Sequence, residues 1–317
     1  MTEILITRPL PDAVVEQARA LGHVTLRPAT TPLSDAELRG ALEDYDAVLP
    51  TLGDMFSAHV FADVPKPRAR ILANFGVGYN HIDVDAAKSA GLAVTNTPGA
   101  VTDATSDIAL TLMLMSARRA GEGERLVRGG DWAGWHPTQM LGLHMSGKHV
   151  GIVGMGRIGQ AIAARCHHGF GMQVSFYNRS LKQVGLPATQ VDSLTELASR
   201  VDFFVVAVPG GADTQHLIGA EVFAAMQPHA RFINIARGEV VDEAALIDAL
   251  QTGQIGAAGL DVYEHEPDVP DALKTCENAV LLPHLGTATE EVRTDMGLMA
   301  VNNLRAFLAG ETPPNLV

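Results

Sequence analysis

Short runs of aliphatic and β-branched residues alternate with helical stretches along almost the whole chain. Five runs lie in the N-terminal part, at residues 3–7, 23–27, 46–50, 70–74 and 92–96. Six more lie further along, at residues 149–154, 173–177, 203–208, 231–236, 256–263 and 279–283. Alternating strands and helices are typical of βαβ units, whose strands lie parallel in one sheet. The sequence therefore predicts an α/β protein with two parallel sheets, one for each series of strands.

The segment between the two series marks the place where the chain crosses between domains. Pro98 and Gly99 interrupt it, and a Thr or Asp residue then caps a long helix that runs to about residue 119. Residues 289–310 form one amphipathic helix with no strand after it, which we expect to pack on the first domain. We predict a discontinuous domain of residues 1–98 plus 287–317, a second domain of residues 99–286, and a cleft between them.

Charge and composition exclude several classes of function. The formal net charge is −13 and the pI is about 5.3, whereas nucleic-acid-binding proteins carry basic surfaces. The most apolar helical stretch, residues 108–115, is far shorter than the ~20 residues that span a bilayer, and the first residues show no signal-peptide pattern. Cys166 and Cys276 lack the spacing of a metal site. We expect a cytoplasmic protein with small-molecule partners and with no nucleic acid, membrane or metal.

A glycine pattern follows the first strand of the second series. The stretch VGIVGMGRIG places Gly154, Gly156 and Gly159 between a strand and a helix. In such a loop the first glycine permits a tight turn, the second lets the backbone approach a pyrophosphate, and the third lets the helix pack on the strand. The N–H groups of the helix N-terminus then face the phosphates. The pattern predicts a Rossmann-like dinucleotide site, held by Gly154, Met155, Gly156, Arg157, Ile158 and Gly159.

The stretch FYNRS, about twenty residues further on, lacks the acidic residue that usually binds the ribose hydroxyls of NAD. Asn178 stands at the expected position, and unlike a carboxylate it does not repel a 2′-phosphate. Arg179 can pair with that phosphate, and Ser180 can donate one more hydrogen bond. We predict that NADP(H) is preferred and that NAD(H) is possible. In the alternative interpretation, Arg179 is a solvated surface residue and Asn178 binds the ribose of NAD.

Three residues with useful chemistry follow three successive strands of the second series. Arg237 follows residues 231–236, Glu266 follows residues 256–263, and His284 follows residues 279–283. If these strands are parallel, all three side chains start from the same edge of the sheet, where ligands bind. Arg237 offers a two-pronged donor to a carboxylate, and His284 can exchange a proton near neutral pH. A hydrogen bond from the imidazole to Glu266 favours the protonated imidazole, which prepares an acid for carbonyl reduction. Each residue alone is equally compatible with a structural role.

The chain resembles the D-isomer-specific 2-hydroxyacid dehydrogenases, and within them the glyoxylate/hydroxypyruvate reductase branch. The similarity lies in NFGVGYNHID (74–83), VTNTPGAVTDATSDIAL (94–110), GKHVGIVGMGRIGQAIA (147–163), NIARGEVVDEAAL (234–246), AAGLDVYEHEP (257–267) and PHLGTAT (283–289). It implies two Rossmann-like or flavodoxin-like domains, a substrate-binding one (1–98 plus 287–317) and a dinucleotide-binding one (99–286). It also implies that Arg237 binds the 2-oxo acid, that His284 is the acid/base and that Glu266 tunes His284.

Further site residues follow from the same resemblance. In NFGVGYN, the loop amides of Val77 and Gly78, with Gly76, are implied to hold the substrate carboxylate. Leu52 is implied to line the other wall of the pocket, although the sequence alone favours a place in the core. The resemblance places Thr105 and Asp261 near the nicotinamide. It also extends the cofactor site to two further residues, Ala236 and Gly286.

The segment GGDWAGWHP contains both tryptophans of the chain. In the reductase branch a Trp from this segment reaches the active site of the neighbouring subunit, and Trp135 resembles it. The alternative is an ordinary buried aromatic residue. In either case two large aromatic residues in an exposed arm favour a homodimer, because Trp is enriched at interfaces.

These observations predict NADPH-dependent reduction of small 2-oxo acids, glyoxylate and hydroxypyruvate, by hydride transfer with His284 as general acid. Two alternatives remain open. One is an NAD-dependent D-lactate or broad D-2-hydroxyacid dehydrogenase. The other is a non-catalytic protein that senses a dinucleotide, although an intact set of Arg237, Glu266 and His284 argues against it.

Overall fold

The computed structural model describes all 317 residues, and the chain forms two compact units. The first unit comprises Met1–Val101 together with Thr287–Val317, and the second comprises Thr102–Gly286. None of the helices combines the length and the apolar character needed to cross a membrane.

The first unit is a five-stranded parallel sheet with helices on both faces. The strand order is β2-β1-β3-β4-β5, with β1 Glu3–Ile6, β2 His23–Leu26, β3 Ala47–Leu49, β4 Ile71–Ala73 and β5 Ala93–Thr95. The helices are α1 Asp12–Arg19, α2 Asp35–Asp44, α3 Ala58–Asp63, α4 Val84–Ser89 and α12 Glu290–Leu308. Every residue of β3 and β4 is buried, as expected for central strands of a parallel sheet covered on both faces.

The C-terminal helix α12 completes the core of the first unit. It packs on α1, and a Cβ placed at Gly297 would lie only 2.4 Å from a methyl group of Val14. Glycine at this position therefore permits the close contact between the two helices. Ala300 and Leu304 continue the buried face of α12. The expectation that this helix packs on the first domain is met within this unit.

The second unit is a seven-stranded parallel sheet in the order β12-β11-β10-β9-β6-β7-β8. The strands are β6 His149–Val153, β7 Gln173–Tyr177, β8 Thr189–Gln190, β9 Phe203–Val206, β10 Arg231–Asn234, β11 Ala257–Leu260 and β12 Ala279–Leu281. The first strand, β6, lies between β7 and β9, so the strand order reverses there. Ligands of doubly wound sheets bind at such a switch point, beyond the carboxyl ends of the strands.

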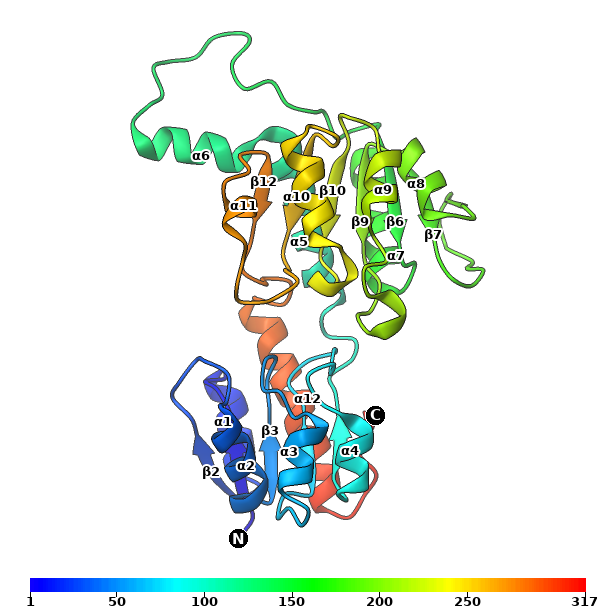
Figure 1. Cartoon of the computed structure of the whole chain (residues 1–317). Helices are drawn as coiled ribbons and strands as arrows, with labels where there is room; N and C mark the ends of the chain where they lie inside the picture. The colour runs from blue at the N-terminus through cyan, green and yellow to red at the C-terminus, as the bar shows by residue number, and fades with distance from the viewer. The chain divides into compact units, whose positions relative to one another are not determined.

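Helices cover both faces of this second sheet, as Figure 1 shows. One face carries α8 Leu194–Arg200, α9 Ala220–Ala225 and α10 Glu243–Gln251, and the other carries α5 Thr102–Arg118 and α7 Arg157–Ala164. A short helix, α11 Asp271–Lys274, precedes β12. The fold class is thus confirmed: two α/β units, each built on a parallel sheet.

An arm leaves this unit between α5 and β6. It contains helix α6 Ala120–Gly129 and a long loop, which Figure 1 shows extending away from the sheet. The amide of Leu143 donates to the carbonyl of Ala117 at 2.8 Å and closes the base of the arm. No residue of α6 is buried.

Two elements differ from the sequence prediction. Six strands were expected in the second sheet, whereas a seventh, β8, pairs with the outer side of β7. It is only two residues long and half exposed, so it produces no apolar run. Helix α6 was also not predicted: it contains Gly121, Gly123 and Gly129, and glycine is a poor helix former.

Candidate active site

The glycine loop joins β6 to α7 at the switch point. Gly154 has φ of +95°, a backbone conformation that favours glycine. A Cβ at Gly159 would lie 2.1 Å from the carbonyl oxygen of Gly154, so only glycine allows the helix to approach the loop so closely. At Gly156, by contrast, no atom lies within 4 Å of the corresponding point. The protein therefore leaves no room for a side chain at Gly154 and Gly159, whereas the space beside Gly156 is empty. Met155 is fully buried, and Arg157 and Ile158 begin α7.

The loop after β7 is fastened to the glycine loop through Asn178. Its Oδ1 accepts a hydrogen bond from the Met155 amide at 3.1 Å, and its Nδ2 donates to the carbonyl of Ser180 at 2.8 Å. Gln190, on β8, then holds the loop from the other side. Its Nε2 donates to the carbonyls of Asn178 and Ser180 at 3.1 and 3.2 Å, and its Oε1 accepts from the Lys182 amide at 3.1 Å. Gln190 was not predicted from the sequence, because the strand that carries it, β8, was not predicted.

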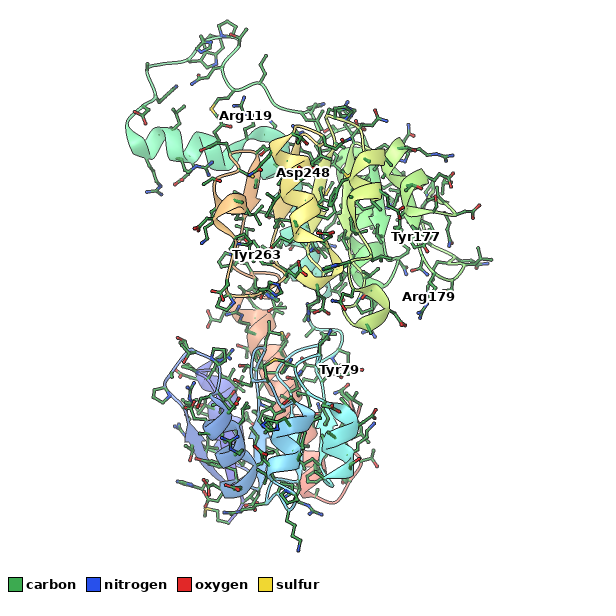
Figure 2. All side chains as sticks on the ribbon, in the orientation of Figure 1. Tyr79, Arg119, Tyr177, Arg179, Asp248 and Tyr263 are labelled. Atoms are coloured by element: carbon green, nitrogen blue, oxygen red, sulfur yellow. The ribbon has the colours of Figure 1, made fainter.

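Arg179 extends from this loop into solvent, two residues beyond Tyr177, as Figure 2 shows. Its side chain is 88% exposed and makes one ion pair, with Asp213 at 3.4 Å. Ion pairs between such exposed groups contribute little to stability. The guanidinium is therefore available to an incoming anion.

Arg237, Glu266 and His284 follow three adjacent strands of the second sheet. These strands, β10, β11 and β12, are parallel and paired in that order. His284 Nδ1 lies 2.8 Å from Glu266 Oε2, and both side chains are 28% exposed. The other carboxylate oxygen, Oε1, accepts from the Tyr263 amide at 3.0 Å. The sequence prediction that the side chains at these strand ends lie close together therefore holds for the His–Glu pair.

The backbone at His284 is unusual for a residue with a side chain. Its φ is +54°, in the left-handed region. Non-glycine residues in this region carry a conformational cost and are concentrated at functional sites. The amide of His284 donates to the carbonyl of Asp261 at 3.0 Å, which helps to hold the turn.

The charge on Glu266 is favoured by its surroundings. Burial works against the carboxylate, but the hydrogen bond and charge of His284, the Tyr263 amide and the Arg237 guanidinium together hold the pKa of Glu266 below its usual value. Glu266 is therefore an anion at neutral pH, and the imidazole beside it faces a negative charge.

Arg237 is positioned by a turn that Asn234 organises. The buried Asn234 side chain accepts from the Ala236 amide and donates to the Arg237 carbonyl, each at 3.0 Å. The Arg237 guanidinium donates to the Ala236 carbonyl at 2.7 Å. Burial lowers the pKa of Arg237, and the charges of Glu266 and Glu239 oppose that shift. An arginine nonetheless stays cationic near neutral pH, so the strand end carries a desolvated positive charge.

Asp261, Thr105 and Gly286 meet beside this group. The two carboxylate oxygens of Asp261 accept from the amides of Leu285 and Gly286 at 2.6 and 2.7 Å. Thr105, on α5, donates to the carbonyl of Gly286 at 3.1 Å. Burial raises the pKa of Asp261, and the Leu285 and Gly286 amides and the His284 charge oppose the shift. These contacts hold the loop that carries His284.

Leu52 and the loop of Gly76, Val77 and Gly78 lie at the carboxyl edge of the first unit's sheet. Leu52 follows β3 and is 40% exposed, so it is not a core residue. Its carbonyl accepts from Arg8 Nη1 at 2.5 Å. The fully buried Asp54 fixes the same loop, because its carboxylate accepts from Arg8 Nη2 at 3.1 Å and from the amides of Thr51 and Leu33 at 2.9 and 3.0 Å.

The neighbouring strand β4 is followed by the loop of Gly76, Val77 and Gly78, in which the Val77 side chain is exposed. Leu52 and this loop therefore follow adjacent parallel strands. Trp135, in the arm of the second unit, is 77% exposed, which rules out the alternative of a buried aromatic residue.

Comparison with known proteins identifies the family. Residues 110–286 match the sequence profile of "D-isomer specific 2-hydroxyacid dehydrogenase, NAD binding domain". The glyoxylate reductase of Thermococcus kodakarensis is 42% identical over 99% of this chain and 96% of the relative. That of Pyrococcus furiosus is 40% identical over 99% of this chain and 95% of the relative. The chain belongs to the D-isomer specific 2-hydroxyacid dehydrogenase family.

A solved structure of this family extends the similarity to three dimensions. The NADPH-dependent glyoxylate/hydroxypyruvate reductase of Sinorhizobium meliloti, in complex with NADP and malonate, is 35% identical. It matches with a TM-score of 0.86 over 100% of this chain and 96% of the other. As a member of this family, the protein is an oxidoreductase that uses a nicotinamide dinucleotide. The open backbone at Gly156 and the N-terminus of α7 fit the pyrophosphate of such a cofactor.

Proposed function

We propose that this dehydrogenase reduces glyoxylate and hydroxypyruvate to their 2-hydroxy acids with NADPH. The observation that carries the proposal is the hydrogen-bonded pair of His284 and Glu266 on strands next to that of Arg237, at the same sheet edge as the glycine loop. The relatives named glyoxylate reductase support the choice of substrate.

The position of each residue gives it a separate role in the reaction. The bound nicotinamide supplies a hydride to C2 of the substrate. Since Nδ1 of His284 faces Glu266, Nε2 is the nitrogen left to give a proton to the carbonyl oxygen. Glu266, an anion, stabilises the imidazolium before that transfer. The oxygen becomes a hydroxyl group, and His284 is left neutral until it takes a proton from solvent.

Arg237 binds and polarises the 2-oxo acid. A guanidinium presents two parallel N–H donors to a carboxylate, and its partial desolvation strengthens that interaction. In this proposal the amides of Val77 and Gly78 bind a substrate carboxylate, and Leu52 lines the substrate pocket. The first unit is the substrate-binding domain, and the second is the dinucleotide-binding domain.

The preference for NADPH rests on the loop after β7. Arg179, whose guanidinium is exposed, and the Ser180 hydroxyl bind the 2′-phosphate. The Asn178 amide is engaged with the Met155 amide and with Ser180, so its role is to shape the loop and to leave the site free of negative charge. Thr105, Ala236, Asp261 and Gly286 complete the cofactor site at the nicotinamide end.

The protein acts as a homodimer in this proposal. The arm exposes Trp132 and Trp135, with exposed fractions of 52% and 77%, and Val127 on α6 is also exposed. A monomer leaves these large apolar side chains in water, whereas a second copy can cover them. Trp135 would then reach the active site of the neighbouring subunit.

The test is a steady-state panel of 2-oxo acids with both cofactors. We expect glyoxylate and hydroxypyruvate to give the highest kcat/KM, and NADPH to exceed NADH at least tenfold. Pyruvate reduced best with NADH would instead identify a D-lactate or broad D-2-hydroxyacid dehydrogenase. Tight dinucleotide binding without turnover of any 2-oxo acid would indicate a sensing protein.

A further inference from the structure

The loop after β4 turns its carbonyl groups toward the side-chain amides of Asn74 and Asn96. Asn74 is fully buried, and its Nδ2 donates to the carbonyls of Gly76 and Gly78 at 3.1 and 3.0 Å. The carbonyl of Gly76 also accepts from the Thr97 amide at 3.0 Å. The carbonyl of Val77 accepts from Asn96 Nδ2 at 2.9 Å. Three successive carbonyls are therefore held by the protein.

This arrangement determines the direction of the loop amides. In a planar trans peptide, the carbonyl oxygen and the next amide hydrogen point in opposite directions. Holding the Gly76 carbonyl against Asn74 therefore turns the Val77 amide away from it. The Val77 carbonyl on Asn96 does the same for the Gly78 amide. Neither amide donates to a protein acceptor, so both are open to an anion.

His81 determines which end of the Asn74 side chain faces the loop. Its Nε2 lies 3.0 Å from Asn74 Oδ1. When this nitrogen carries a hydrogen, it donates to Oδ1, which leaves the NH₂ group of Asn74 for the two carbonyls. A flipped amide would place an oxygen against both carbonyls and an NH₂ group against the ring N–H. The buried His81 thus orients the Asn74 side chain, which in turn holds the loop.

We propose that Asn74 is the positioning residue that presents the Val77 amide to the substrate carboxylate, beside the Gly78 amide that Asn96 orients, with His81 as the orienting partner of Asn74. The inference rests on the proposed function, because it deepens the role given there to the loop. It differs from a purely structural role in what it predicts: removal of the Asn74 amide weakens the binding of carboxylates and leaves the dinucleotide unaffected.

The decisive variant is the isosteric Asn74→Asp. An Asp oxygen in place of Nδ2 meets the Gly76 and Gly78 carbonyls without a hydrogen, so the loop reorients its amides. The hydrogen bond from the Val77 amide to the charged carboxylate is then lost, and we expect KM for glyoxylate to rise about ten- to a hundredfold. KM for NADPH stays within about twofold of the wild-type value. Asn74→Ala, which removes the donors without adding a charge, raises KM for glyoxylate less.

Two further variants separate positioning from folding. Asn315→Asp is a matched control, because it removes a side-chain amide donor from the same unit, where Asn315 Nδ2 donates to Asn303 at 3.1 Å. It leaves both KM values unchanged. His81→Leu raises KM for glyoxylate, whereas His81→Gln, which retains a donor near the position of Nε2, restores it. Thermal denaturation of each variant reports whether the fold is intact.

The outcomes distinguish this inference from the proposed function. An unchanged KM for glyoxylate in folded Asn74→Asp, with an active wild-type enzyme, overturns the inference alone. A parallel rise in KM for NADPH overturns it as well, since that marks general damage. If the wild-type protein reduces no 2-oxo acid, the proposed function fails, and calorimetric titration with oxalate in the presence of NADPH then decides the inference. Weaker oxalate binding by Asn74→Asp supports it, and equal binding refutes it.

Discussion

The replacement Glu266→Gln tests the electrostatic partnership at the centre of the site. Gln has nearly the same shape and can still accept from the Tyr263 amide, which lies 3.0 Å from Oε1, but it carries no charge. At about 4 Å, two unit charges interact by about 4 kcal/mol at an effective dielectric constant of ~20. Both side chains are 28% exposed, so solvent screening reduces this to roughly 1.5 kcal/mol, which is about a factor of ten in rate.

The assay is kcat/KM for glyoxylate reduction with NADPH at neutral pH. In Glu266→Gln we expect this constant to fall about tenfold, because the neutral Gln no longer supports the proton donation by His284. KM for NADPH should stay within about twofold of the wild-type value. An unchanged kcat/KM would refute the idea that the Glu266 charge assists His284.

The same carboxylate links stability to pH, and the sign follows from its lowered pKa. A carboxyl group whose pKa is lower in the folded protein than in the unfolded chain stabilises the fold above its unfolded value of ~4.3. That contribution is lost as the pH falls through the folded-state pKa. Denaturant unfolding below pH ~4.3 should therefore show a steeper loss of stability in the wild-type protein than in Glu266→Gln.

Three other variants test the elements around the site. Gln190→Ala frees the loop after β7 and should raise KM for NADPH several-fold with little change for NADH; equal effects on both cofactors would contradict a role at the 2′-phosphate. Asp54→Ala leaves buried donors without an acceptor and should lower the free energy of unfolding in urea by roughly 3 kcal/mol, whereas a change below about 1 kcal/mol would show that the Leu52 loop needs no such anchor. Trp132→Ala combined with Trp135→Ala should convert the dimer to a monomer in light scattering, and a monomeric wild-type protein would refute the arm as an interface.

The strands could be predicted from the sequence because each central one is an apolar run with helical stretches on either side. Parallel sheets bury both faces of their strands, so β3, β9 and β11 consist wholly of buried residues. The two missed elements lack such signals. The outer strand β8 is only two residues long, which is too short for an apolar run. Helix α6 contains Gly121, Gly123 and Gly129, and glycine is a poor helix former.

Some residues of the candidate site could likewise be predicted from the sequence, and others could not. Arg237, Glu266 and His284 could be placed from the sequence because the edge of a parallel sheet brings successive strand ends together. Asn74, Asn234 and Gln190 could not, because each acts by bonding to loop backbone whose direction is known only after folding. An Asn at the carboxyl end of an apolar strand was the available signal for the first two. For Gln190 no signal was present once its short strand had been missed.

The most direct test of the whole account compares the wild-type enzyme with His284→Ala. The measurement is glyoxylate-dependent oxidation of NADPH, with NADPH binding followed separately by fluorescence. We predict turnover by the wild-type enzyme, a loss of about 10²- to 10⁴-fold in kcat for His284→Ala, and NADPH binding equal in both. Equal kcat in the two proteins would contradict the account at its centre, because His284 would then not be the acid that completes the reduction.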